Sequence, residues 1–212
     1  MTLIWNSHEL TEGAWNGLKL QEVWYNQEMI WPTDVWYFYD DFERSTLGSN
    51  WSPASGALIV DGELKKNSSN GSSDNWTAQS FPTDDLRVLT TLGTVGDANQ
   101  RSSIAIGSPD QYVFAEFSVN GGIIGDYDGW TWTNRATIPS MTLNRNTIIE
   151  VRRLGTTIQF LHNNSIRATA TSSFGRGTGH RKVNLSVRRN SNFFGTYYSP
   201  TFDDVKIGLY QP

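Results

Sequence analysis

Apolar and polar residues alternate along several short segments of the chain, which is the period-2 pattern of β-strands with one buried face. Segment 112–119 places its core-type residues at odd positions and Tyr112, Phe114, Glu116 and Ser118 at even ones. The predicted inward positions are Leu86, Val88, Thr90, Leu92, Val113, Ala115, Phe117, Val119, Ile149, Val151, Val183, Leu185 and Val187. These segments therefore predict strands that share one core.

Strand-like segments recur at turn-punctuated spacing, separated by dipeptides such as Asp61-Gly62, Gly121-Gly122 and Asn163-Asn164. The strands expected after the opening segment are 35–42, 58–60, 63–65, 76–80, 86–92, 102–106, 112–119, 123–127, 147–153, 157–162, 166–170, 183–188 and 205–209. Polar stretches 66–75 and 172–179 are predicted loops, and no segment favours a helix. About a dozen short strands without helices indicate an all-β antiparallel sandwich or jelly roll.

Two segments far apart in the sequence share one pattern: each contains an aromatic residue, an acidic pair and the start of a strand. They are 40–51 and 202–208. Strands near the beginning and the end of a sandwich domain commonly pair, so we expect these two to be neighbours in one sheet.

The first 36 residues differ from the rest of the chain. Segments 17–25 and 28–31 predict two strands joined by a turn at Asn26-Gln27, and Pro32 ends the second. Five of the nine tryptophans lie here: Trp5, Trp15, Trp24, Trp31 and Trp36. A lone hairpin cannot bury them. They pack either on the following domain or on another chain, and we expect Trp5, Trp15, Trp24 and Trp31 to make oligomer or attachment contacts.

Composition sets further bounds. The chain has 212 residues, which fits one ordinary domain with an appendage, so we divide it into 1–36 and 37–212. It has no cysteine, which excludes disulfides and Cys-based zinc sites. The N-terminal segment lacks the basic start and apolar run of a secretory signal, and no segment has the roughly 20 apolar residues of a membrane span.

Charge is distributed unevenly along the sequence. Residues 1–140 carry 7 Lys and Arg against 18 Asp and Glu, whereas residues 141–212 carry 10 against 3. Interleaved strands would neutralise these charges in space, and a basic face for an anionic partner is the alternative. The pairs Arg152-Arg153, Arg181-Lys182 and Arg188-Arg189 would each be split between opposite strand faces, so no nucleic-acid-binding stripe is expected.

The domain resembles concanavalin A-like (laminin G-like) jelly rolls over nearly all of residues 38–210. The residues that carry the resemblance are Asp40 to Trp51, Leu58 to Leu64, Glu150 to Asn164 and Phe202 to Ile207. This resemblance implies a concanavalin A-like antiparallel β-sandwich preceded by the short N-terminal hairpin. It also implies a calcium ion on the closing strand, for which Asp40, Asp41, Asp203 and Asp204 are the candidate ligands. The alternative is that these acids cap turns or pair with arginines.

The opening segment is similar to that of minor tail proteins of phages that infect actinobacteria. The segment is Leu20 to Trp31, with Gln27 where those openings usually place glycine. The resemblance implies a virion protein of the phage tail, made in the host cytoplasm and repeated around a symmetry axis, most simply as a trimer. Its implied partners are other tail proteins and host cell-wall glycans.

Candidate chemistry is sparse. Glycosidases need two carboxylates that flank the scissile bond, and laminarinase-like relatives of the fold place them as E-x-D-x-x-E. None of the eight Glu residues has Asp two positions later, and we expect Glu116 and Glu150 to face solvent. The three histidines show no metal spacing.

One carboxylate pair lies beside aromatic residues that could stack on a sugar ring. Asp126 and Asp128 would share a face if extended, next to Trp130 and Trp132, although Asp side chains that stabilise a turn would explain the pair equally well. We therefore select Asp126, Asp128, Trp130 and Trp132 as a carbohydrate-binding set and predict a non-enzymatic structural and binding protein. The alternatives are an independent lectin module and a glycanase with an atypical carboxylate pair.

Overall fold

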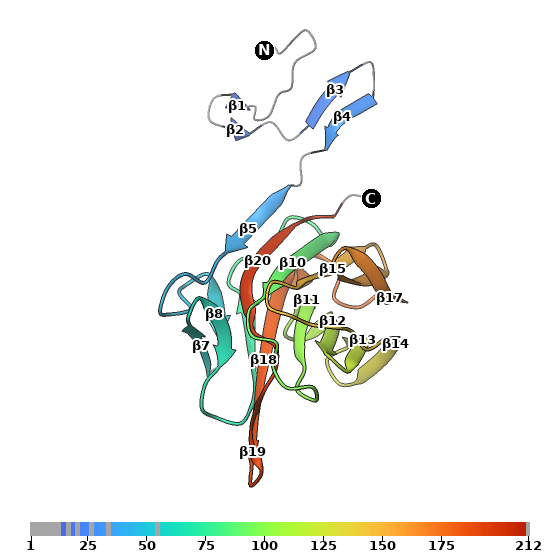
Figure 1. Ribbon diagram of the computed structural model, residues 1–212. Coiled ribbons are helices and arrows are strands. Elements are labelled where there is room, and N and C mark those ends of the chain that lie inside the picture. The colour runs from blue at the N-terminus through green and yellow to red at the C-terminus, as the bar shows by residue number, and fades with distance from the viewer. Residues whose placement is uncertain are drawn as a thin grey trace. The chain divides into compact units, whose positions relative to one another are not determined.

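The computed structural model describes residues 35–53 and 56–210, together with four strands that precede them (Figure 1). The chain divides into two compact units, Met1–Val35 and Trp36–Pro212. In the first unit β1 (Ala14–Trp15) pairs with β2 (Leu18–Lys19), and β3 (Glu22–Tyr25) pairs with β4 (Glu28–Pro32), both antiparallel. The predicted hairpin is therefore present as β3 and β4, and its turn lies outside the described residues.

The second unit contains two antiparallel sheets. The first sheet has the order β17-β16-β15-β10-β20-β8-β7, and β5 also pairs with β20. Its strands are β5 (Trp36–Asp40), β7 (Ala57–Val60), β8 (Glu63–Lys66), β10 (Leu86–Leu92), β15 (Ile148–Leu154), β16 (Thr157–His162), β17 (Ser165–Thr171) and β20 (Phe202–Leu209).

The second sheet has the order β14-β13-β12-β11-β18-β9-β6, with β19 added beside β18. Its strands are β6 (Trp51–Pro53), β9 (Gly71–Thr77), β11 (Ser102–Ser108), β12 (Gln111–Ser118), β13 (Gly121–Tyr127), β14 (Trp132–Ile138), β18 (Lys182–Asn192) and β19 (Gly195–Tyr198). Within the described residues, helical structure is limited to the 3-10 turn η1 (Thr178–His180). The predicted all-β sandwich is confirmed.

The core lies between the inner faces of the two sheets and follows strand alternation. On β10 every second residue is buried, from Leu86 to Leu92, as the sequence pattern predicts. Rings from both sheets meet in this layer, where Phe117 of β12 contacts Phe160 of β16 at 5.5 Å and Phe202 of β20 at 6.4 Å between ring centroids. Burial of these aromatic and branched side chains supplies most of the driving force for folding.

The expected pairing of the first and last strands of the domain is also confirmed. β5 and β20 are antiparallel neighbours, with Asp40 opposite Val205 and Phe38 opposite Ile207. Because Phe38, Val205 and Ile207 all belong to the core, Asp40 lies on the inner face of the sheet.

Part of the predicted loop 66–75 is strand instead. Residues 71–77 form β9, which pairs with β18 and places Ser73, Asn75 and Thr77 on the inner face. These inward residues are small and polar, so they lack the apolar alternation that marks a strand. The Asn75 amide nitrogen donates to the carbonyl oxygens of Ser73 and Leu185, which makes its burial tolerable. Strands β6, β14 and β19 were not predicted.

The charge asymmetry along the sequence resolves into pairs across the fold. Basic residues of the C-terminal third contact acidic residues of the earlier part, as in Arg145–Glu63 at 3.3 Å and Arg181–Asp84 at 2.9 Å. Interleaved strands therefore neutralise much of the imbalance. In the part of the chain that the structure describes, no helix has the length and apolar character needed to cross a membrane.

Candidate functional site

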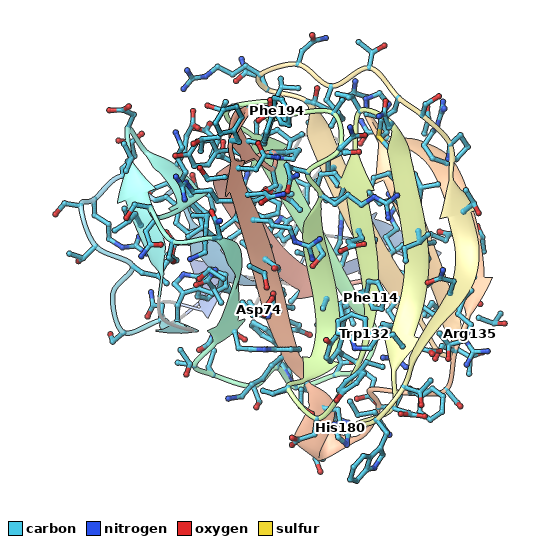
Figure 2. The ribbon with its side chains drawn as sticks, turned by 90° about the horizontal axis from the view of Figure 1, so that it is seen from below. Asp74, Phe114, Trp132, Arg135, His180 and Phe194 are labelled. Atoms are coloured by element: carbon cyan, nitrogen blue, oxygen red, sulfur yellow. The ribbon has the colours of Figure 1, made fainter. Side chains whose placement is uncertain are left out.

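The outer face of the second sheet carries the residues that alternate away from the core. Figure 2 views this sheet from outside, with His180 beyond one end of β18 and Phe194 at the other. The outward positions include Asp74 and Trp76 on β9, Asn184 and Ser186 on β18, Ser103, Ala105 and Gly107 on β11, Tyr112, Phe114 and Glu116 on β12, Tyr127 on β13, and Trp132 on β14.

Five rings gather on this face and form what we call the aromatic patch: Trp76, Tyr112, Phe114, Tyr127 and Trp132. Tyr112 lies at the centre, with centroid distances of 5.5 Å to Trp76, 5.3 Å to Tyr127 and 5.6 Å to Trp132. Trp132 also contacts Phe114 at 5.1 Å, and its side chain is 59% exposed. Trp76, Tyr112 and Tyr127 are half-buried and Phe114 is buried, so the patch presents Trp132 and the edges of three further rings to solvent, and the rings hold one another in place.

Asn184 lies beside the patch, opposite Trp76 on β9 and Ala105 on β11. Its residue is 3% exposed, and its side-chain oxygen has no hydrogen-bond partner among the described residues. A buried oxygen without a partner costs about 1–3 kcal/mol. Such a group is rare in folded proteins and marks this part of the face as incompletely satisfied.

Tyr112 supplies a second polar group to the patch. Burial, and then the negative charge of Asp74, raise the pKa of Tyr112. The hydroxyl therefore stays protonated at neutral pH and can donate a hydrogen bond.

A polar pocket of about 240 Å³ lies on the same face, at the Glu116 end of β12. Arg101 and Arg188 approach Glu116 from two sides, at 3.4 Å and 3.3 Å respectively. Asn99 and Asn120 complete the polar lining and hydrogen-bond to each other at 3.0 Å.

The segment that follows β17 borders the opposite end of the patch and is held from inside the sandwich. Arg153 on β15 is fully buried and donates to the carbonyl oxygens of Phe174 at 2.6 Å and Gly175 at 2.7 Å. The Gly175 nitrogen in turn donates to the Gln111 side chain at 3.2 Å. The position of this border therefore depends on a buried cation.

The two aspartates chosen from the sequence do not share a face. β13 ends at Tyr127, so only Asp126 lies on the strand. Asp126 is 1% exposed and accepts from Arg135 at 2.7 Å and 3.3 Å. Asp128 accepts from the backbone nitrogens of Trp130 and Thr131, which lowers its pKa and stabilises the turn. The turn interpretation accounts for Asp128.

The two tryptophans of the same set lie in different surroundings. Trp130 is at the tip of this turn and is 93% exposed, whereas Trp132 packs within the aromatic patch. The sequence analysis missed Trp76, Tyr112, Phe114 and Tyr127. The signal for Tyr112 and Phe114 was present in segment 112–119, where these two rings occupy the face opposite the core residues.

The four acids proposed as calcium ligands do not converge. Both oxygens of Asp40 are engaged, by Arg44 at 2.5 Å and 2.6 Å, by the Trp51 indole at 2.7 Å and by the Phe42 nitrogen at 2.9 Å. Asp41 is exposed and accepts from the Glu43 nitrogen.

The two acids of the closing strand do not pair with Asp40, whose partner across the sheet is Val205. Asp204 lies opposite Thr91 and accepts from its nitrogen at 2.8 Å, and burial raises the pKa of Asp203. Calcium takes six to eight oxygen ligands, and the described residues contain no group of three or more His, Asp or Glu side chains placed to hold a metal. The four acids named from the sequence therefore do not form a calcium site together. Whether the protein binds calcium is not tested by this, so calcium binding stays a prediction.

Of the tryptophans assigned to assembly, Trp15, Trp24 and Trp31 belong to β1, β3 and β4, while Trp5 lies outside the described residues. Their contacts stay a prediction. Trp36, by contrast, packs on the domain, because the Arg87 guanidinium lies 4.7 Å above its ring.

The expectation for Glu150 was wrong. It faces away from the core on β15, but it is 1% exposed because Arg87 of the neighbouring strand and Arg152 bond to the same carboxylate, at 3.0 Å and 2.8 Å. Glu116 is partly exposed and also paired with arginines. Neither glutamate is a free carboxylate.

The two-sheet sandwich is a concanavalin A-like jelly roll, and solved structures of this fold are similar to it. The carbohydrate recognition domain of Emp47p aligns with a TM-score of 0.63 and 13% identity, covering 81% of this chain and 94% of that one. Bacillus licheniformis β-glucanase aligns with a TM-score of 0.59 and 13% identity over 82% and 98% of the two chains.

A third similar structure is the exoplasmic/lumenal domain of VIP36 in its form bound to Ca²⁺ and Man3GlcNAc. Its TM-score is 0.56 at 10% identity, over 77% of this chain and 84% of that one. No protein-family model and no curated protein matches the sequence. The fold is therefore shared by carbohydrate-binding domains and by a glucanase.

Proposed function

We propose that the domain binds a glycan on the outer face of its second sheet and does not cleave it. The observation that carries this proposal is the aromatic patch beside the unpartnered oxygen of Asn184. Aromatic faces stack on the apolar faces of sugar rings, and the neighbouring Asn184 side chain has an acceptor oxygen without a partner among the described residues. The carbohydrate-binding domains among the similar structures support the same assignment.

The placement of carboxylates supports binding without hydrolysis. Hydrolysis needs two carboxyl groups about 5–9.5 Å apart across the sugar. The outward acids nearest the patch are Asp74 on β9 and Glu116 on β12, and two strands separate them. At about 4.8 Å per strand their backbones are about 14 Å apart. Glu116 is also bound to two arginines.

Substitution within the patch tests the proposal. Trp132→Ala and Trp76→Ala should each weaken glycan binding about tenfold or more, because each removes a stacking surface. Binding is measured on a glycan array and then by calorimetry, with Trp130→Ala as the exposed control. Reducing-end assays on the same glycans should show no release. Binding that survives both patch substitutions would place the site elsewhere, and cleavage would favour the glycanase.

We further propose that the chain works as a structural component of a phage tail, with residues 1–36 as its assembly segment. Support comes from the similarity of segment 20–31 to tail-protein openings and from the division of the chain at Val35. The tryptophans of the first unit then face other copies of the chain or other tail proteins.

Deleting residues 1–34 tests this role. The intact chain should run as an oligomer, most simply a trimer, in light scattering, whereas the truncated chain should be a folded monomer. Circular dichroism checks that the truncated domain keeps its β structure. A monomeric intact chain would contradict the assembly role, and unfolding of the truncated chain would place the tryptophans in the domain's own core.

A further inference from the structure

We infer that the glycan is acidic, and that its anionic substituent binds between Arg101 and Arg188. This inference rests on the proposed function and adds the chemical class of the ligand. The pocket of about 240 Å³ at the end of β12 is large enough for a carboxylate or phosphate together with part of its sugar ring.

The two guanidinium groups are available to such a ligand. Among the described residues each makes one side-chain contact, to Glu116 at 3.4 Å and 3.3 Å, which is long for a charge-assisted hydrogen bond. Each guanidinium has five N–H donors, so most of them remain for a ligand. Their side chains are 39% and 44% exposed. The pair is therefore open to solvent and only loosely satisfied.

The local charge favours an anion. Two guanidinium groups share one carboxylate, so the pocket carries a net charge of about one positive unit at neutral pH. The amides of Asn99 and Asn120 add uncharged polar groups to the lining. Arginine recognises carboxylate and phosphate through paired N–H donors, and a second guanidinium supplies them from another direction.

The pocket and the aromatic patch can contact one ligand. Tyr112, Phe114 and Glu116 alternate on one face of β12, which places Glu116 about 13 Å from Tyr112 along the strand. Asp74 opposes binding of an anion, but it lies on β9, with β18 and β11 between it and Glu116. An oligosaccharide stacked on the patch therefore places its charge at the arginine end of the face.

Matched ligands test the inference on the intact chain. Calorimetry compares an oligogalacturonate, its methyl ester, a neutral galacto-oligosaccharide and a sugar-phosphate polymer. The carboxylate or the phosphate ligand should bind about tenfold more tightly than the neutral ones at low salt, and the advantage should shrink as salt rises. Preference between the two anions identifies the source of the charge.

Variants then assign the preference to the pocket. Arg101→Gln and Arg188→Gln should each remove most of the advantage of the acidic ligand. Glu116→Gln should increase that advantage severalfold, because it removes the competing carboxylate and keeps the shape. Arg167→Gln on β17, which makes the same charge change on the first sheet, should leave the advantage intact.

The outcomes separate this inference from the proposed function. Equal affinity for acid and methyl ester, with Trp132→Ala still damaging, overturns the acidic ligand and leaves glycan binding in place. A preference that persists in both arginine variants places the anion elsewhere and also overturns the inference. Absence of binding to every glycan overturns both.

Discussion

Replacing Arg153 by alanine should lower the stability of the domain by about 3–5 kcal/mol. Arg153 is among the largest fully buried side chains, and its guanidinium donates to the carbonyl oxygens of Gly155, Phe174 and Gly175. The substitution leaves a cavity and removes the donors of buried acceptors. At about 2–4 °C per kcal/mol for a domain of this size, the melting temperature should fall by about 6–20 °C.

The loss should not depend on pH between 5 and 9. Burial, and then the charge of Arg176, lower the pKa of Arg153 to about 10. The group therefore stays protonated over that range in both the folded and the unfolded chain, and its protonation contributes no pH dependence to the free energy of unfolding. Thermal denaturation of Arg153→Ala, Arg153→Lys and the exposed control Arg167→Ala measures this. An alanine variant as stable as the parent would show that the segment after β17 is held by other contacts.

The sequence predicted strands wherever one face is apolar, because that signal depends only on neighbours two residues apart. β10 and β12 are examples, and their inward residues were assigned correctly. Residues 71–75 of β9 were missed because the inward residues Ser73 and Asn75 are polar, and Asn75 becomes acceptable inside only through a partner far along the chain. A local sequence pattern cannot show that the buried amide of Asn75 will find the carbonyl oxygen of Leu185.

The candidate site was less predictable than the fold, since five strands and the residues near their ends build it. Trp132 was selected because of its neighbours in the sequence, but the rings that hold it are Tyr112, Phe114 and Tyr127, which come from other strands. The pair Asp126 and Asp128 was misleading because it assumed that the strand continues past Tyr127. Strand alternation predicts that Arg152 and Arg153 point to opposite faces of β15. The carbonyl partners of Arg153 are set by the tertiary structure, so they could not be predicted from the sequence.

Asp40→Asn should cost about 2–3 kcal/mol at pH 7, the second large loss that we expect. Asp40 lies 4% exposed on the inner face of β5 and accepts from Arg44, from the Trp51 indole and from the Phe42 nitrogen. Phe42 has a φ of 53°, a left-handed conformation that a phenylalanine adopts only when its surroundings enforce it. Asparagine keeps the size of the side chain and removes the negative charge that accepts the hydrogen bonds of the turn after β5.

The cost of this substitution should shrink in acid. Burial raises the pKa of Asp40, but hydrogen bonds from Arg44, Trp51 and Phe42 outweigh burial and hold the pKa below its ordinary value of 3.8. The carboxylate therefore contributes its full stability above about pH 4, and the contribution is lost as pH falls through the lowered folded-state pKa. Melting temperatures of the parent, Asp40→Asn and the exposed control Asp41→Asn, measured from pH 7 to pH 2.5, should show the first two converging. If the gap stays constant down to pH 2.5, the carboxylate charge is not what stabilises the corner, and the loss at neutral pH comes from geometry alone.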